Sequence, residues 1–128
     1  MIVLDASVLI AHLESTDAHH DRARALLLAA AGDPYGASPL TLAEVLVHPA
    51  RIGQLDRASA ALQQLAVTSV ELLPDAPLQL ALLRAGTGLK LPDCCVLLAA
   101  ESARAAVATF DDRLAAAARA RGVAVRDN

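Results

Sequence analysis

Asp5 is a carboxylate in an otherwise apolar stretch at the beginning of this 128-residue sequence. It directly follows the aliphatic run 2–4, and no other charged residue precedes Glu14. A carboxylate in such a setting is rarely buried unless a partner, a proton or a metal ion compensates its charge. The first question for the rest of the chain is therefore which group compensates Asp5.

Three further acids stand in similar surroundings. Glu44 and Asp93 are each the only charge in an apolar segment, and Asp111 comes just after the short run 106–109. Two of the four acids thus follow predicted strands, and two lie near the starts of predicted helices. These positions meet at one edge of a parallel sheet. Carboxylates that converge there repel one another unless a divalent cation is present, and carboxylate oxygens suit Mg²⁺ or Mn²⁺ better than zinc.

Each acid taken singly also has a structural explanation. An aspartate at a helix start is stabilised by free backbone N–H groups and by the helix dipole, so Asp93 and Asp111 are candidate helix caps. Glu44 fits this explanation less well, because it lies about two turns into an apolar helix. Only the combination of four such acids favours a shared site.

The elements that must position these acids alternate along the chain. Short aliphatic or β-branched runs predict strands at 2–4, 67–73, 106–109 and 123–125, and residues 35–38 are a weaker strand candidate. Helical periodicity predicts helices at 7–13, 18–31, 39–48, 53–66, 75–85, 92–103 and 111–122. We expect the helix from Pro39 to end at His48, because a residue before proline avoids the helical region. The pattern predicts an α/β fold with a small, mainly parallel sheet of four to five strands and about seven helices.

Composition limits the alternatives. The length fits one domain over residues 1–128, and 55% hydrophobic with 2% aromatic residues predicts an aliphatic core. A net charge of −3 argues against binding nucleic acid by bulk positive charge, although local charge matters more. Adjacent Cys94 and Cys95 favour a reducing compartment. The sequence has no convincing signal peptide and no apolar run long enough to span a membrane, so we expect a cytoplasmic protein without membrane contact.

The four acidic segments carry a family resemblance. Asp5 in Val-Leu-Asp-Ala-Ser-Val-Leu-Ile resembles the opening motif of the PIN domain, and Glu44 in Leu-Ala-Glu-Val is similar to its second motif. Leu-Pro-Asp at Asp93 and Thr-Phe-Asp at Asp111 resemble the third and fourth motifs. Their order, spacing and the chain length are most similar to VapC-type toxins of bacterial toxin–antitoxin pairs. The resemblance spans nearly the whole chain.

The resemblance implies a PIN-like fold and a Mg²⁺-dependent endoribonuclease, with Mn²⁺ as a substitute ion. Asp5 and Asp93 would be the principal metal ligands, and Glu44 and Asp111 would complete the acidic cluster. The hydroxyls of the supporting positions, Ser7 and Thr109, would hold the cluster by hydrogen bonds or through water. Asp112 is an alternative to Asp111; we expect Asp111 to be the site residue, as the one nearer the strand end, and Asp112 to cap the following helix.

The implied chemistry is hydrolysis of RNA phosphodiester bonds by a metal-activated water, which Glu44 or Asp111 would orient. The implied partners are the RNA substrate, a VapB-type antitoxin protein and a second copy of the chain in a homodimer. The main alternative is a non-catalytic PIN-like module that binds RNA or protein. A receiver-like signalling domain fits least, because the acidic pair after the first strand and the late lysine of such domains are both absent.

Overall fold

Strand β1 (Ile2–Leu4) occupies the centre of the fold in the computed structural model, which describes all residues 1–128. The sheet has five strands in the order β3-β2-β1-β4-β5, and every neighbouring pair is parallel. The other strands are β2 (Tyr35–Ala37), β3 (Thr68–Ser69), β4 (Ala106–Ala108) and β5 (Val125–Arg126). The predicted parallel α/β sheet is confirmed.

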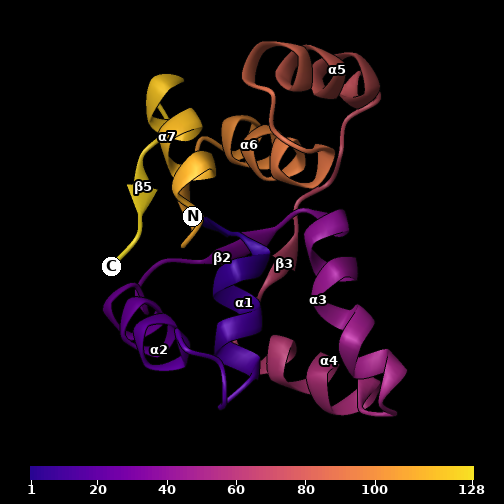
Figure 1. Cartoon of the computed structure of the whole chain (residues 1–128), viewed down its shortest axis with the longest axis vertical. Helices are drawn as coiled ribbons and strands as arrows, with labels where there is room; N and C mark the ends of the chain where they lie inside the picture. Colours follow the sequence, from indigo (N-terminus) through magenta and orange to yellow (C-terminus); the bar gives the residue numbers. More distant parts are fainter.

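Seven helices cover the two faces of the sheet, as Figure 1 shows. They are α1 (Ala6–Leu13), α2 (His20–Ala29), α3 (Pro39–Arg51), α4 (Leu55–Gln64), α5 (Ala76–Thr87), α6 (Leu91–Ala103) and α7 (Asp112–Ala120). None of them combines the length and the apolar character needed to cross a membrane.

Two aliphatic clusters hold these layers together, one on each face. Ile2 and Leu4 of β1 belong to the cluster that includes residues of α1, α2, α3 and α4. Val3, whose side chain points to the opposite face, belongs to the cluster formed with α5, α6 and α7. Burial of each such Leu or Val side chain stabilises the fold by about 1.5–3 kcal/mol. The alternation along β1 therefore fixes the strand between two layers of helices.

The strand register places polar residues in a row at the carboxyl edge of the sheet. Leu4 is level with Ala108, so the next residues, Asp5 and Thr109, lie side by side. On the other side Val3 is level with Gly36, which brings Ser38 to the level of Asp5. The edge at which we expected a site is thus lined by Asp5, Ser38 and Thr109.

One predicted boundary is wrong. Helix α3 does not end at His48 but continues through Pro49 to Arg51. Proline removes only its own N–H donor, and the last turn is kept by the bond from Ile52 N to His48 O at 3.2 Å. Gly53, with a φ of +72°, then ends the helical path.

The edge strands also differ from the prediction. The predicted strand 67–73 pairs only at Thr68–Ser69, and the last strand lies at Val125–Arg126 rather than 123–125. Each of these edge strands pairs with only one neighbour. No second neighbouring strand fixes where the strand begins and ends, so the sequence pattern predicts its limits less well.

Candidate acidic active site

Asp5 is compensated by two hydroxyl groups. The residue is only 6% exposed, and its Oδ2 accepts hydrogen bonds from Ser7 Oγ at 2.7 Å and Thr109 Oγ1 at 2.8 Å. Although Asp5 is the N-cap residue of α1, its side chain makes no capping hydrogen bond. Helix capping therefore does not account for this buried acid. Oδ1 makes no hydrogen bond and remains available to a ligand.

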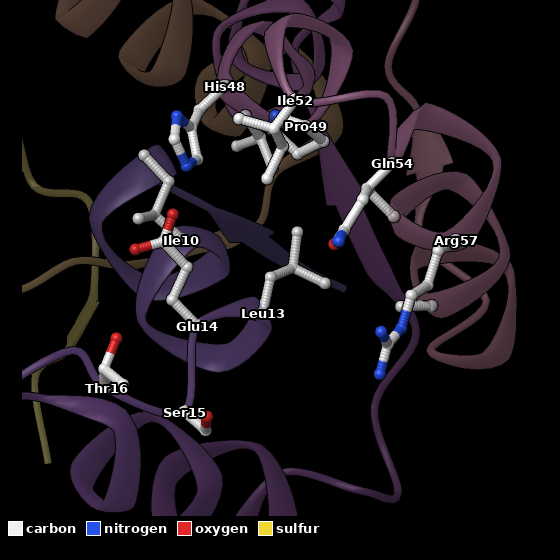
Figure 2. A pocket seen from close by; sticks show the side chains of 13 residues that line it. Ile10, Leu13, Glu14, Ser15, Thr16, His48, Pro49, Ile52, Gln54 and Arg57 are labelled. Carbon is white, nitrogen blue, oxygen red and sulfur yellow. The ribbon is translucent and has the colours of Figure 1, made fainter.

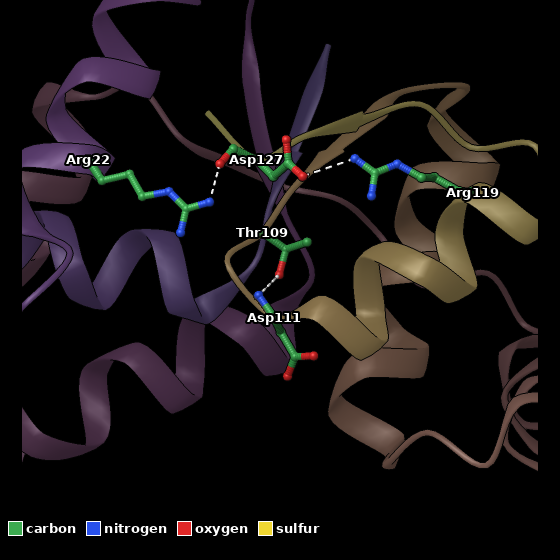
Figure 3. Close-up of polar contacts among 5 residues, drawn as sticks. All are labelled: Arg22, Thr109, Asp111, Arg119 and Asp127. Carbon is green, nitrogen blue, oxygen red and sulfur yellow. Dashed lines mark hydrogen bonds and ion pairs between the residues drawn. The ribbon is translucent and has the colours of Figure 1, made fainter.

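The same two hydroxyls tie Asp5 to the chain after β4. Ser7 Oγ accepts from the backbone N–H of Phe110 at 3.0 Å, and Thr109 Oγ1 accepts from that of Asp111 at 3.0 Å (Figure 3). Each hydroxyl thus donates to the carboxylate and accepts from the backbone. The network fixes the beginning of α7 against the beginning of α1.

Asp111, and not Asp112, caps helix α7. Its Oδ1 accepts from the backbone N–H groups of Arg113 at 2.9 Å and Leu114 at 3.1 Å. Asp111 has the extended backbone of an N-cap residue, whereas Asp112 is already the first residue of the helix. The expectation that Asp112 is the cap is therefore wrong. Asp111 Oδ2 makes no hydrogen bond, so the capping residue retains one free carboxylate oxygen.

Glu44 and Asp93 reach the same region from α3 and α6. Burial raises the pKa of Glu44, and the charges of Asp5 and Asp93 raise it further. Burial likewise raises the pKa of Asp93, together with the charges of Asp5 and Asp111. Carboxylates affect one another's pKa in this way only when they lie near each other. The structure thus brings the four acids selected from the sequence into one region with excess negative charge.

A cleft of about 330 Å³ opens above this region. Its walls include three of the acids, Glu44, Asp93 and Asp111, and two cations, Lys90 and Arg113. Both cations lower the pKa of Asp93, opposing the effect of its acidic neighbours. The cleft therefore combines carboxylates that can hold a cation with basic groups that can contact a phosphate.

The acids are close but not yet arranged around one point. As the side chains are placed, no three His, Cys, Asp or Glu side chains lie near enough together to coordinate a single ion. Asp5 does not line the cleft, but its charge acts on Glu44 and Asp93 and its Oδ1 is free of hydrogen bonds. The other three acids line the cleft. A cation that keeps several of its own waters needs only one or two direct carboxylate ligands.

Two buried hydroxyl residues beside the acids escaped the sequence interpretation. Ser38 is fully buried after β2 and accepts a hydrogen bond from Leu40 N at 3.1 Å, and Thr41 is 1% exposed in the first turn of α3. Small hydroxyl residues give no signal in composition or periodicity. The one usable signal was the position of Ser38, which ends a predicted strand as Asp5 does.

A larger cavity lies elsewhere on the molecule. It measures about 390 Å³, and its walls come from α1, α3 and α4 with the adjoining loops, including Ile10, Leu13, His48, Ile52 and Arg57 (Figure 2). None of the four acids lines it. Cavity size therefore does not identify the acidic site.

The C-terminal residues cross the sheet edge next to this site. Strand β5 extends to the site through the bond from Thr109 N to Arg126 O at 3.2 Å. Asp127 then binds two arginines, since Arg119 donates to its carboxylate at 3.0 Å and Arg22 donates to its backbone carbonyl (Figure 3). Arg22 also lies over the ring of Phe110, 4.3 Å from the ring centre. The chain end thus pairs with Arg119 in the last turn of α7 and contacts Arg22, which lies against Phe110 next to Asp111.

Comparison with solved structures shows relatives of the same fold. A chain of a toxin–antitoxin complex from Klebsiella pneumoniae is 26% identical, with a TM-score of 0.76 and 91% of each chain covered. VapBC2 from Rickettsia felis, bound to a DNA fragment from its promoter, gives 13% identity, a TM-score of 0.74 and 98% coverage of each chain. VapC20 of Mycobacterium tuberculosis, a sarcin-ricin loop cleaving toxin, is 20% identical, with a TM-score of 0.61. The match covers 91% of this chain and 95% of the VapC20 chain.

Sequence comparison identifies the family. No curated protein sequence gives a significant match. The family model of the PIN domain, however, matches residues 2–120, which include all four acidic segments. The resemblance to the PIN domain that the four motifs predicted is confirmed. By this match over nearly its whole length, together with its five-stranded parallel sheet, the chain belongs to the PIN domain family.

Proposed function

We propose that this chain, as a single nuclease domain over residues 1–128, is a metal-dependent endoribonuclease and the toxin of a VapBC-type toxin–antitoxin pair. The observation that carries the proposal is that Glu44, Asp93 and Asp111 line one cleft, where burial and the charge of nearby Asp5 raise the pKa of both Glu44 and Asp93. Carboxylates held together at this energetic cost are typical of functional sites, and a bound cation relieves their repulsion.

Mg²⁺, or Mn²⁺ in its place, fits the donor set. Asp5 and Asp93 would be the principal ligands, with Glu44 and Asp111 completing the shell directly or through water. The free Oδ1 of Asp5 and the free Oδ2 of Asp111 supply oxygen donors of the kind that these ions prefer. When bound, the ion supplies a water of lowered pKa and neutralises part of the phosphate charge.

Glu44 is the best candidate to orient the attacking water and accept its proton. Burial and the charges of Asp5 and Asp93 raise its pKa, which makes the carboxylate a stronger base, and it lines the cleft. Asp111 is less free for this task, because Oδ1 is engaged in capping α7. These two observations support Glu44 rather than Asp111 as the proposed general base.

Lys90 and Arg113 are suited to hold the RNA phosphate. Both line the cleft with the acids, and both carry a positive charge close enough to act on Asp93. A phosphodiester placed between them and the carboxylates would have its charge balanced on one side and face the attacking water on the other. RNA is the proposed substrate class, supported by the relative that is a sarcin-ricin loop cleaving toxin.

The proposed protein partners are a VapB-type antitoxin and a second copy of this chain. Relatives from Klebsiella pneumoniae and Rickettsia felis were solved as toxin–antitoxin complexes, which supports the antitoxin. Leu78 and Leu82, one turn apart on α5, are 71% and 67% exposed and offer apolar surface for contact between copies. The two unpaired cysteines support a reducing, cytoplasmic setting.

The test is to incubate the purified chain with total cellular RNA, with Mg²⁺ or with EDTA, and to sequence the new 5′ ends. We expect defined cleavage sites in Mg²⁺ that disappear in EDTA and with Asp93→Asn. Retention of RNA without any cut would support the alternative, a non-catalytic PIN-like binding module. Cuts that persist in EDTA would contradict the metal-dependent proposal.

A further inference from the structure

The chain buries only four polar or charged residues: Asp5, Ser38, Thr41 and Thr109. All four lie at or just beyond the carboxyl edge of the sheet, beside the candidate site. Asp5 and Thr109 bond each other, and Ser38 accepts from Leu40 N. Thr41 is the exception, because its Oγ1 is fully buried and has no hydrogen-bond partner.

This isolated hydroxyl has a physical cost. A buried polar group without a partner destabilises a protein because it loses its hydrogen bonds to water, and valine would fill nearly the same volume without that loss. The usual partner of a helical threonine is the carbonyl four residues earlier. Here that carbonyl belongs to Ala37, which accepts from Val70 N at 2.8 Å, and Thr41 makes no such bond. The fold gains nothing visible from the hydroxyl.

The surroundings of Thr41 connect it to Glu44. The two residues are three positions apart on α3 and therefore lie on neighbouring turns of one helix face. Helical side chains tend to lean toward the N-terminus, so the turn that contains Thr41 is within reach of the Glu44 carboxylate. Burial raises the pKa of the Cys95 thiol, and Ser38 and Glu44 are both near enough to act on it. Thr41 lies between Ser38 and Glu44 along the helix.

We propose that Thr41 is a positioning residue of the acidic site. Its hydroxyl donates a hydrogen bond to the Glu44 carboxylate, directly or through one buried water, once a cation has drawn the acids together. This bond orients the carboxylate that handles the attacking water. The inference rests on the proposed nuclease function and adds to it a residue that no acidic motif contains.

The test compares Thr41→Val with Thr41→Ser and the wild type in three measurements. These are thermal unfolding, Mn²⁺ binding to the metal-free protein by calorimetry, and kcat and KM for RNA cleavage. We expect Thr41→Val to unfold at the same or a higher temperature, because it removes an unpaired hydroxyl. We expect its Mn²⁺ affinity and kcat to fall about tenfold or more with KM unchanged, the typical effect of losing a group that orients a metal ligand. Thr41→Ser restores both.

Thr68→Val is the matched control. Thr68 Oγ1 donates to Tyr35 O at 3.2 Å, and its strand β3 lies at the edge of the sheet. This variant should keep the wild-type Mn²⁺ affinity and kcat. The inference fails if Thr41→Val binds Mn²⁺ and cleaves RNA like the wild type. It also fails if Thr41→Val is less stable and Thr41→Ser restores only that stability.

The outcomes separate this inference from the proposed function. If the wild type cleaves RNA and Thr41→Val has the same kcat and Mn²⁺ affinity, the proposed role of Thr41 is wrong but the nuclease proposal stands. A wild type that binds Mn²⁺ without cleaving RNA overturns the nuclease proposal, and the Mn²⁺ affinities of the variants still decide the role of Thr41. A wild type that neither binds Mn²⁺ nor cleaves RNA overturns both.

Discussion

Individual residues in this protein combine structural and chemical tasks. Thr109 Oγ1 donates to Asp5 and accepts from Asp111 N, so one hydroxyl holds two acids of the site. Ser7 does the same for Asp5 and Phe110. The two hydroxyl donors replace part of the hydration that the Asp5 carboxylate loses on burial. The hydroxyls explain how Asp5 is tolerated in an apolar surround before any cation binds.

Thr109→Val tests this explanation. The variant leaves Asp5 with one hydroxyl donor and leaves Asp111 N without its acceptor, so we expect a loss of about 1–3 kcal/mol in the free energy of unfolding. We also expect RNA cleavage to fall at least tenfold. Urea unfolding and cleavage rates give the two values. Ser102→Ala, which removes an exposed hydroxyl bonded to Ala99 O, should change neither by much; an equal loss there would contradict the account.

The sequence identified the acids but not all of their supports. Asp5, Glu44 and Asp93 were recognisable because each is isolated in an apolar segment. Ser38 and Thr41 were not, since a hydroxyl in such a segment is common and its burial depends on tertiary packing. Whether Asp111 or Asp112 caps α7 depends on the residue at which the backbone changes from the extended to the helical conformation. Adjacent identical residues carry no information about that turn.

Among the elements, the helix starts do most to position the site. Asp5 precedes α1, Ser38 precedes α3, and Asp111 precedes α7, each at the end of a parallel strand. The sequence predicted these junctions well, because a strand-to-helix change of periodicity is abrupt. It predicted the far ends less well. Pro49 predicted that α3 ends at His48, but the helix continues to Arg51. Strand β3 is shorter than the predicted strand 67–73, because it pairs with one neighbour only.

Asp111 allows capping and chemistry to be separated within one element. Asn caps a helix about as well as Asp, so Asp111→Asn should keep the stability within about 0.5 kcal/mol, whereas Asp111→Ala should lose about 0.5–2 kcal/mol. If Asp111 contributes a charge to the site, both variants lose RNA cleavage. Chemical unfolding and cleavage assays check this. An Asn variant with full activity would show that Asp111 only caps α7.

At the scale of the whole molecule, excess negative charge at one edge of the sheet should lower stability at neutral pH. The native pKa values of Glu44 and Asp93 are raised above their ordinary values of 4.5 and 3.8. The native state therefore binds more protons than the unfolded state between the ordinary and the raised values. Stability falls as pH rises through that window, and the full penalty remains above it.

This penalty predicts how the metal-free protein unfolds. At pH 8 Asp93→Asn should unfold at a higher temperature than the wild type, by roughly 2–4 °C, and the difference should shrink as the pH is lowered through the window set by the raised pKa of Asp93. Mg²⁺ should raise the melting temperature of the wild type more than that of the variant. Differential scanning fluorimetry with and without EDTA measures both effects. A variant that is less stable at pH 8 would show that Asp93 is a structural residue.

The charge distribution near the chain end gives a further prediction. Asp127 pairs with Arg119, and this hydrogen bond lowers the pKa of the Asp127 carboxyl. Asp127→Asn should remove the negative charge that faces Arg119 and Arg22, of which Arg22 lies against Phe110 next to Asp111. Binding of a single-stranded RNA should tighten by roughly two- to fivefold at low salt, with the gain lost at high salt. Fluorescence anisotropy measures the affinity. Asp56→Asn, at an exposed position of α4, is the control that should show a smaller gain.

The central claim is that acids from separate elements of this PIN domain form one metal-dependent catalytic site. The most direct test is the cleavage rate of a defined single-stranded RNA by the wild type, Asp5→Asn and Asp93→Asn at saturating Mg²⁺, with folding checked by circular dichroism. We predict that both variants stay folded and lose cleavage by a factor of about 100 or more. Full cleavage by either folded variant would contradict the claim.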